Sequence, residues 1–224
     1  MYHFLQSCFN SLLPKRCPTC SEGIVAEPTP VCSTCWAQLW TSVSPRAINL
    51  SYAWGGTSIL PYHLPHVANA MRSIKFGGRP DLAIALGQLM AQTIPMPEVD
   101  VLVPVPLRAD RDYARGYNQA EHIALGLHRI WGTALATDLI RRPLTLKNFG
   151  AKGQALRKES DRFGIYGAYE ITNSEHLKGL RIALIDDTLT TGSTLNAAAE
   201  VLQKKTRVAD VIPLTLAYAV RLRS

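Results

Sequence analysis

The residues best suited to chemistry form one short string, in which two acids precede a run of hydroxyl side chains and a glycine. Asp186 and Asp187 follow the apolar run 180–185, and the string continues with Thr188, Leu189, Thr190, Thr191, Gly192, Ser193 and Thr194. Carboxylates accept hydrogen bonds from sugar hydroxyls and stabilise positive charge developing on a ribose. Hydroxyls and unpaired amides at a helix start bind anions. The string therefore predicts a site for a phosphorylated ribose.

Taken singly, these residues have ordinary explanations. Ser and Thr before a helix are commonly plain N-caps, and paired aspartates also occur in metal sites and solvated turns. The complete order of apolar strand, two acids, Thr-Thr-Gly-Ser-Thr and amphipathic helix favours the ligand site. Gly192 adds to this, because a residue without a Cβ lets the backbone approach a phosphate closely.

Three arginines form a second candidate anion site. The apolar run 103–107 leads directly into Arg108, Arg111 and Arg115. Guanidinium groups hold phosphates through paired hydrogen bonds, so the cluster favours a diphosphate. The alternative is that Asp110 and Asp112 pair with these arginines on a wet surface, where such pairs contribute little.

Four of the five cysteines form two Cys-x-x-Cys pairs, Cys17 with Cys20 and Cys32 with Cys35. Two such pairs aim four thiolates at one point, as in the tetrahedral shell of a structural Zn²⁺ site. The alternative is disulfides, and the odd cysteine count and a reducing cytosol weigh against it. Cys8 stands apart and is typical of a small buried apolar residue.

The apolar pattern predicts an α/β protein with a parallel sheet flanked by helices. Strands are expected at 58–60, 99–105, 180–185 and 208–217, and helices at 64–74, 82–90, 120–130 and 195–202. Strands that alternate with helices favour a parallel sheet, whose ligands lie beyond the carboxyl ends of the strands. We predict an N-terminal helix and zinc ribbon at 1–50 and the larger domain at 51–224.

The composition is typical of a packed globular protein and excludes a disordered one. The chain has 224 residues, of which 47% are hydrophobic and 18% are charged, with a formal net charge of +7. A positive balance favours polyanionic partners, and the basic residues are densest at 141–162. No apolar run approaches the roughly 20 residues of a membrane span. We read no signal peptide at the N-terminus and expect a cytoplasmic protein.

Residues 184–194 resemble the PRPP-binding signature of type I phosphoribosyltransferases. Together with the cysteine pairs, the segment 74–79 and the run 103–107 followed by Arg-Gly-Tyr-Asn-Gln, the chain resembles the ComF family (ComFC- and GntX-type proteins). The resemblance implies a type I phosphoribosyltransferase-like fold and PRPP, bound with Mg²⁺, at the acids, the hydroxyl loop and the three arginines. It also implies a link to DNA uptake, with single-stranded DNA and competence proteins as partners.

Two functions stay open. One is a PRPP-binding protein of DNA uptake whose basic stretch 141–162 contacts a single-stranded DNA backbone. The other is an active phosphoribosyltransferase, in which Asp186 and Asp187 steady the ribose while a nitrogenous acceptor attacks its anomeric carbon. The segment that would cover the ligand departs from the family pattern between Thr145 and Ile165, and no acceptor pocket is recognisable. A PRPP-sensing regulator is a third hypothesis.

Overall fold

The computed structural model describes residues 16–25, 28–107, 116–141 and 169–219. Its centre is a six-stranded sheet with the order β1-β2-β8-β7-β3-β4. The strands are β1 (Arg46–Ile48), β2 (Gly56–Pro61), β3 (Val101–Pro104), β4 (Ala134–Leu135), β7 (Arg181–Leu189) and β8 (Asp210–Tyr218). All neighbours run parallel except β1 and β2, so the predicted parallel α/β fold is confirmed.

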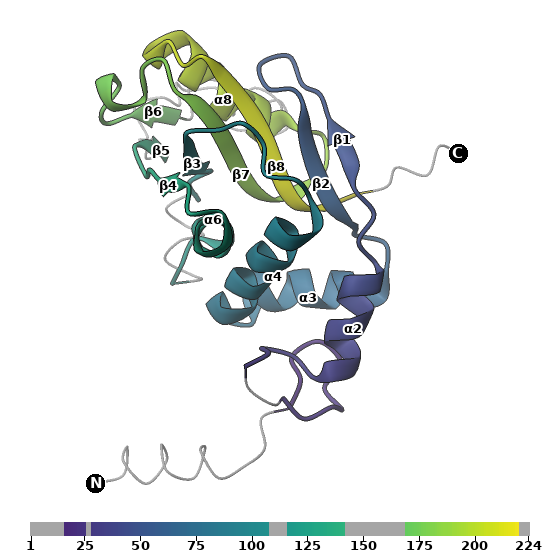
Figure 1. The fold of residues 1–224 in the computed structure, drawn as a ribbon. Helices are drawn as coiled ribbons and strands as arrows, with labels where there is room; N and C mark the ends of the chain where they lie inside the picture. Colours follow the sequence, from purple (N-terminus) through teal and green to yellow (C-terminus); the bar gives the residue numbers. More distant parts are fainter. Residues whose placement is uncertain (1–15, 26–27, 108–115, 142–168, 220–224) are drawn as a thin grey trace, which may run out of the picture.

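Helices cover both faces of the sheet (Figure 1). The helices α3 (Pro65–Phe76), α4 (Pro80–Thr93) and α6 (Gln119–Trp131) lie on one face, and α8 (Ser193–Thr206) lies on the other. Ala183 and Ile185 pack with the first group, whereas Ile182 and Leu184 pack with α8. The side chains of β7 therefore alternate between two apolar layers, which explains its continuous apolar sequence.

The helices α4 and α6 approach each other through two glycines. A Cβ on Gly87 would lie 2.2 Å from the carbonyl oxygen of Ile123, and one on Gly126 would lie 2.2 Å from that of Ile84. Both distances are far below any real contact, so only glycine fits at this crossing.

Asn118 joins the start of α6 to the end of β3. Its Oδ1 accepts from the amide of Ala120 at 3.1 Å, and its Nδ2 donates to the carbonyl of Val105 at 3.1 Å. One side chain thus caps the helix and holds the chain that leaves the strand.

The N-terminal segment packs against the larger part of the chain. Its helix α2 (Ser33–Thr41) begins inside the second cysteine pair. Val31, Cys35 and Leu39 belong to the same buried cluster as α3 and α4. The boundary at residue 50 stays a prediction, and β1 (46–48) pairs with β2 in the main sheet.

A small second sheet lies beside the main one. It consists of β5 (Leu139–Arg141) and β6 (Tyr169–Ile171), which pair antiparallel, and the 3-10 helix η2 (Glu175–Leu177) follows. Tyr169 and Leu177 are buried in the layer that contains α8. In the described part of the chain, no helix combines the length and apolarity that a membrane crossing requires.

Candidate functional site

The acid pair lies within a strand rather than after one. β7 runs on to Leu189 and stays paired with β8, with Asp186 opposite Thr215 and Leu189 opposite Tyr218. The expected strand end at residue 185 is therefore wrong by four residues. Residue 185 marks instead the end of pairing with β3. In the described residues, the last hydrogen bond between these two segments runs from Val105 N to the Ile185 carbonyl, at 2.8 Å.

Strand geometry separates the two carboxylates. Successive side chains of a strand point to opposite faces, so Asp187 shares the α3 face with Ile185, and Asp186 shares the α8 face with Leu184. The carboxylate of Asp186 accepts from the amide of Asp187 at 2.8 Å. The two acids therefore flank, from its two sides, the edge of β7 that has no paired strand among the described residues.

Lys75 lies on the α3 side of the acid site, which comprises Asp186, Asp187 and the residues in contact with them. Its Nζ lies 3.2 Å from Asp187 Oδ1 and donates to Thr188 Oγ1 at 3.0 Å. The Lys75 and Asp187 side chains are only 19% and 15% exposed. The helix predicted at 64–74 left Lys75 just beyond its end, and the structure places Lys75 in the last turn of α3.

The hydroxyl loop is short and leads directly into α8. Thr190 and Thr191 are exposed, and Gly192 adopts a left-handed conformation with φ 76° as the N-cap residue of α8. Thr191 Oγ1 and Ser193 Oγ lie 2.8 Å apart, and Ser193 N lies 3.4 Å from Thr191 Oγ1. No acidic residue occurs in the first turn of α8. Hydroxyls and a positive helix end therefore face solvent together, an arrangement that suits an anion.

Leu50 supports this loop from outside α8. A Cβ on Gly192 would lie 2.6 Å from Leu50 Cδ2. The neighbouring segment is held to α8, because Tyr52 N donates to Asn196 Oδ1 at 3.1 Å and Gln203 Nε2 donates to the Tyr52 carbonyl at 3.0 Å. The glycine thus satisfies both a backbone conformation and a close approach.

The three predicted arginines, Arg108, Arg111 and Arg115, lie outside the described residues, as does most of the basic stretch 141–162. The residues that follow the arginines are described. Tyr117 donates its hydroxyl to the carbonyl of Ile74, and its ring meets that of His122 edge-on at 5.1 Å between centroids. The segment after the arginines therefore contacts the helix that carries Lys75.

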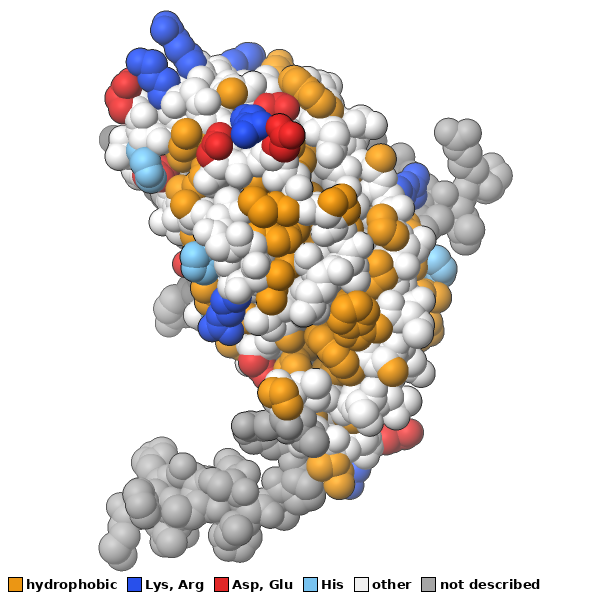
Figure 2. Space-filling view, viewed as in Figure 1, with side chains coloured by type: hydrophobic (Ala, Val, Ile, Leu, Met, Phe, Trp, Pro, Cys, Tyr) orange, Lys and Arg blue, Asp and Glu red, His pale blue; other side chains and the backbone are white. Residues whose placement is uncertain are grey.

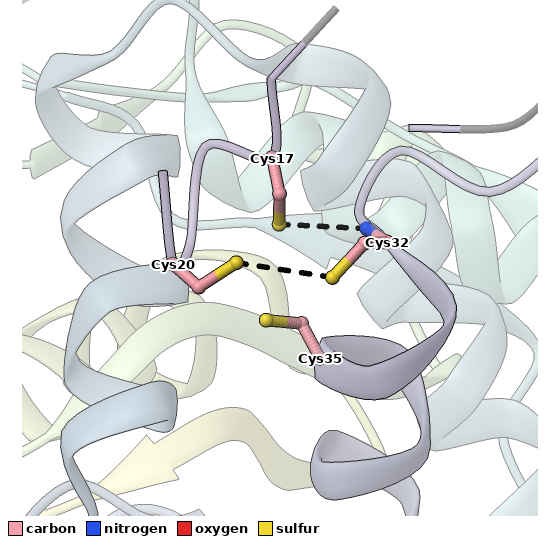
Figure 3. Close-up of side chains that lie close together, drawn as sticks. All are labelled: Cys17, Cys20, Cys32 and Cys35. Carbon is pink, nitrogen blue, oxygen red and sulfur yellow. Dashed lines mark hydrogen bonds between the residues drawn. The ribbon is translucent and has the colours of Figure 1, made fainter. Parts of the chain in front are cut away.

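The four cysteines converge, as the spacing predicted. Their sulfurs all lie within 4.8 Å of one another and point toward a common centre (Figure 3). Cys20 Sγ and Cys32 Sγ are 3.8 Å apart, which matches the separation of about 3.8 Å between thiolates in a tetrahedral shell with zinc–sulfur bonds of about 2.3 Å. This cluster can hold a metal ion such as zinc.

Backbone amides prepare two of the sulfurs for the thiolate state. Burial opposes ionisation of Cys17, but the amides of Cys32, Cys20 and Thr19 outweigh it and lower its pKa to about 6. The amide of Gly23, at 3.3 Å, lowers the pKa of Cys20. Burial raises the pKa of Cys35, with further contributions from the neighbouring sulfurs. Like charges held this closely need a cation, since each thiolate disfavours the next.

The cysteine cluster is attached to α3 and α4 by side chains that donate to its loop carbonyls. Asn69 Nδ2 donates to Thr19 at 3.0 Å, and Ser73 Oγ donates to Pro18 at 2.9 Å. Arg79 donates to the Pro30 carbonyl at 2.6 Å while its guanidinium also pairs with Asp81. The helix α3 therefore contacts the cysteine cluster through Asn69 and Ser73 and the acid site through Lys75.

Basic side chains gather at the other end of the sheet, where β7 begins (Figure 2). Lys178, Lys204, Lys205 and Arg207 are exposed there. The segment before β7 and the end of α8 meet there through a hydrogen bond of 3.0 Å from Gly179 N to the Arg207 carbonyl. Lys178 and Lys204 pair with Glu175 and Glu200, at 3.4 and 2.6 Å.

Comparisons with known proteins find competence and DNA-utilisation proteins. The chain is 37% identical over 116 residues to competence protein ComFC of Bacillus subtilis (strain 168), which covers 52% of this chain and 43% of that protein. It is 24% identical over 203 residues to competence protein F of Haemophilus influenzae, covering 84% of each. It is 25% identical over 195 residues to DNA utilization protein YhgH of Salmonella typhi, covering 83% of each. The predicted ComF resemblance is confirmed.

No family model matches the chain. Among solved structures, it is similar to the glutamine PRPP amidotransferase from B. subtilis, with a TM-score of 0.45 and 19% identity. That match covers 65% of this chain and 30% of the amidotransferase. It is also similar to a hypoxanthine phosphoribosyltransferase from Staphylococcus aureus, with a TM-score of 0.33 and 15% identity over 64% of this chain and 65% of that one.

Proposed function

We propose that this chain, whose relatives are competence and DNA-utilisation proteins, binds PRPP at the β7–α8 junction and takes part in the uptake or use of external DNA in the cytoplasm. The observation that carries the proposal is the position of the acid pair. Asp186 and Asp187 flank a strand edge that is unpaired within the described residues. The three residues 190–192, which end in the left-handed Gly192, then lead from β7 to the exposed Ser193 at the start of α8.

Each part of the ligand has a matching group. The 5-phosphate of the ribose binds the hydroxyls and amides of residues 190–194, where the helix dipole favours negative charge. The ribose hydroxyls donate to the carboxylates of Asp186 and Asp187. The diphosphate extends toward the segment of Arg108, Arg111 and Arg115, which enters the proposal from the sequence alone, and Mg²⁺ bound to the diphosphate offsets part of its charge.

Calorimetric titration with PRPP and Mg²⁺ tests this site. We expect one PRPP per chain, with an affinity at least roughly tenfold lower in Asp186→Asn and Asp187→Asn, because the amide loses the charge that a sugar hydroxyl prefers as acceptor. Asp210→Asn is a matched control, since Asp210 makes the same local contact with the next amide, at 2.7 Å, at the other end of the sheet. Absence of PRPP binding to the unmodified chain would refute the proposal.

The alternative function is transfer of the phosphoribosyl group to a nitrogenous acceptor. The position of the carboxylates on both sides of the strand edge favours it, because negative charge near the ribose stabilises the positive charge that develops as the diphosphate leaves. Release of diphosphate from PRPP with any of a panel of nucleobases, lost in Asp187→Asn, would support transfer. Binding without release would leave the chain a PRPP-binding protein.

Zinc is the metal that we propose for the cysteine cluster. Four thiolates leave no open position for a substrate, so the ion has a structural role. It binds where Cys17, Cys20, Cys32 and Cys35 converge and offsets the repulsion between their charges. Metal analysis of purified protein should give one zinc per chain, and Cys35→Ser should reduce it.

Single-stranded DNA is the proposed partner. The stretch 141–162 holds seven basic and two acidic residues, which is +5 of the net charge of +7. The exposed group of Lys178, Lys204, Lys205 and Arg207 adds a basic surface at the end of the sheet opposite the acid site. Phosphate contacts by Lys and Arg release counterions, so affinity should fall steeply between low and moderate salt. An affinity that barely changes with salt would contradict this mode of binding.

A further inference from the structure

Lys75 is held beside the carboxylate of Asp187. It comes from the last turn of α3, and Thr188, its hydrogen-bond acceptor, lies 113 positions further along the chain. Its ammonium lies between Asp187 Oδ1, at 3.2 Å, and Thr188 Oγ1, at 3.0 Å. Both charged side chains are more than four-fifths buried. Burial strengthens the pair, because screening by water and salt is weak there.

The position of α3 does not require this ion pair. Met71 and Ile74 are fully buried in the cluster beneath the sheet. The hydroxyl of Tyr117 donates to the carbonyl of Ile74, and Ser73 donates to Pro18. An apolar side chain at position 75 would therefore leave most contacts of α3 in place. A lysine buried beside a carboxylate there needs another explanation.

Charge compensation provides that explanation. The adjacent carboxylates of Asp186 and Asp187 repel a polyanionic ligand that binds at this part of β7. A lysine beside Asp187 offsets one of these charges before the ligand arrives. An ammonium on a flexible four-carbon stem also has three donors, so it can keep Thr188 and Asp187 and still turn a donor toward a phosphate.

We propose that Lys75 is a ligand-binding residue that makes the acid site selective for a diphosphate-bearing ribose. This inference rests on the proposed function. In the free chain Lys75 neutralises Asp187. In the complex Asp187 accepts from a ribose hydroxyl, and the Lys75 ammonium contacts the oxygen of the anomeric diphosphate nearest the ring. A ribose 5-phosphate lacks that group and gains less from Lys75.

Titrations of PRPP with Mg²⁺ and of ribose 5-phosphate against the full chain test the inference. We expect Lys75→Met to lower the affinity for PRPP by roughly tenfold or more, as for loss of a charged hydrogen bond, and to change that for ribose 5-phosphate by a smaller factor. Lys75→Arg should recover part of the loss. Arg181→Met is the control: it removes an equal charge, from an exposed ion pair with Glu98 at the other end of β7.

A second comparison separates ligand contact from simple neutralisation of Asp187. If Lys75 contacts the diphosphate, Lys75→Met should also weaken PRPP binding in the Asp187→Asn background. Loss of the effect in that background, or equal losses for both ligands, would overturn the inference while leaving PRPP binding by the unmodified chain intact. Failure of the unmodified chain to bind PRPP would overturn the proposed function and this inference with it. Matching unfolding temperatures would show that the variants are folded.

Discussion

The hydroxyl of Ser73 donates to the carbonyl of Pro18 at 2.9 Å and shares its proton with the carbonyl of Asn69, at 2.8 Å in its own helix. Ser73 lies two residues before Lys75 on that helix. Pro18 lies in the loop between Cys17 and Cys20, so this loop and the acid site contact opposite sides of one turn of α3. Asn69 adds a second contact to the same loop, at the carbonyl of Thr19. These contacts connect the position of Lys75 to the cysteine cluster, so a metal bound there would affect more than its own loop.

Removal of the metal should weaken both the fold and the ligand site. Without a cation the four sulfurs repel or take up protons, and the loop carbonyls that receive bonds from Asn69 and Ser73 move. We expect chelation to lower the unfolding temperature by on the order of 10 °C and to reduce PRPP affinity. Differential scanning calorimetry and titration, with zinc added back as the control, would measure both. An unchanged PRPP affinity in fully metal-free, folded protein would contradict the connection through α3.

The variant Ser73→Ala tests the same connection without touching the metal. It removes the donor to Pro18 and should cost about 1 kcal/mol of unfolding free energy, as for one partly buried hydrogen bond, with full zinc content and a small loss of PRPP affinity. Thr41→Ala is the control, because the Thr41 hydroxyl donates only within its own helix, to Ala37 at 3.0 Å and Gln38 at 3.1 Å. Equal effects of the two variants on PRPP affinity would argue against the connection.

Replacement of Gly192 by alanine should impair the loop. A left-handed conformation costs a residue with a Cβ roughly 1–2 kcal/mol, and the new methyl group would lie 2.6 Å from Leu50 Cδ2. Gly179→Ala is a matched control, with φ 74° and no atom within 4 Å of the added Cβ. Urea unfolding should show both variants destabilised and Gly192→Ala more so, and only Gly192→Ala should lose PRPP affinity. Normal PRPP binding by Gly192→Ala would remove this loop from the site.

Stability should depend on the protonation of His66. Its Nε2 lies 2.6 Å from Ser42 Oγ, and burial lowers its pKa. Below the ordinary histidine value of about 6.5, the unfolded chain takes up a proton that the folded chain resists. The neutral His66 therefore contributes its full share of the unfolding free energy above that pH. This share is lost as the pH falls toward the folded-state pKa. Urea unfolding at pH 8 and pH 6 with zinc present should show a smaller difference for His66→Gln than for the unmodified chain. His63→Gln, at an exposed position, should keep the difference.

Much of the fold follows from local sequence, because long apolar runs and helical spacing reflect burial on both faces of one sheet. The expected helix at 120–130 corresponds to α6, and the strand at 208–217 corresponds to β8. The strand β1 and the small β5–β6 sheet were not predicted, because three-residue strands carry too little periodicity. The extension of β7 through Asp186 and Asp187 was missed because aspartate is rare in strands and common in turns. Their pairing with β8 outweighs that local preference.

In the candidate site, too, the features set by local sequence were predicted and those set by tertiary packing were not. The spacing of the cysteines predicted their convergence, since two short turns fix it locally. Lys75 was not assigned to the site because its partners, Asp187 and Thr188, are distant in sequence, and only the packing of α3 against β7 brings them together. Asn118, which was named from the sequence only as part of the run Arg-Gly-Tyr-Asn-Gln, caps α6 in the structure.

The contact between Gly87 and Gly126 limits how this protein can vary. At both positions an added methyl group would meet a backbone carbonyl oxygen, which cannot rotate away as a side chain can. The separation of α4 and α6 is therefore a fixed dimension, whereas the apolar side chains around the crossing can be exchanged by repacking. Sequence drift can proceed at those neighbouring positions without displacing Asn118 at the start of α6 or the end of β3 that it holds.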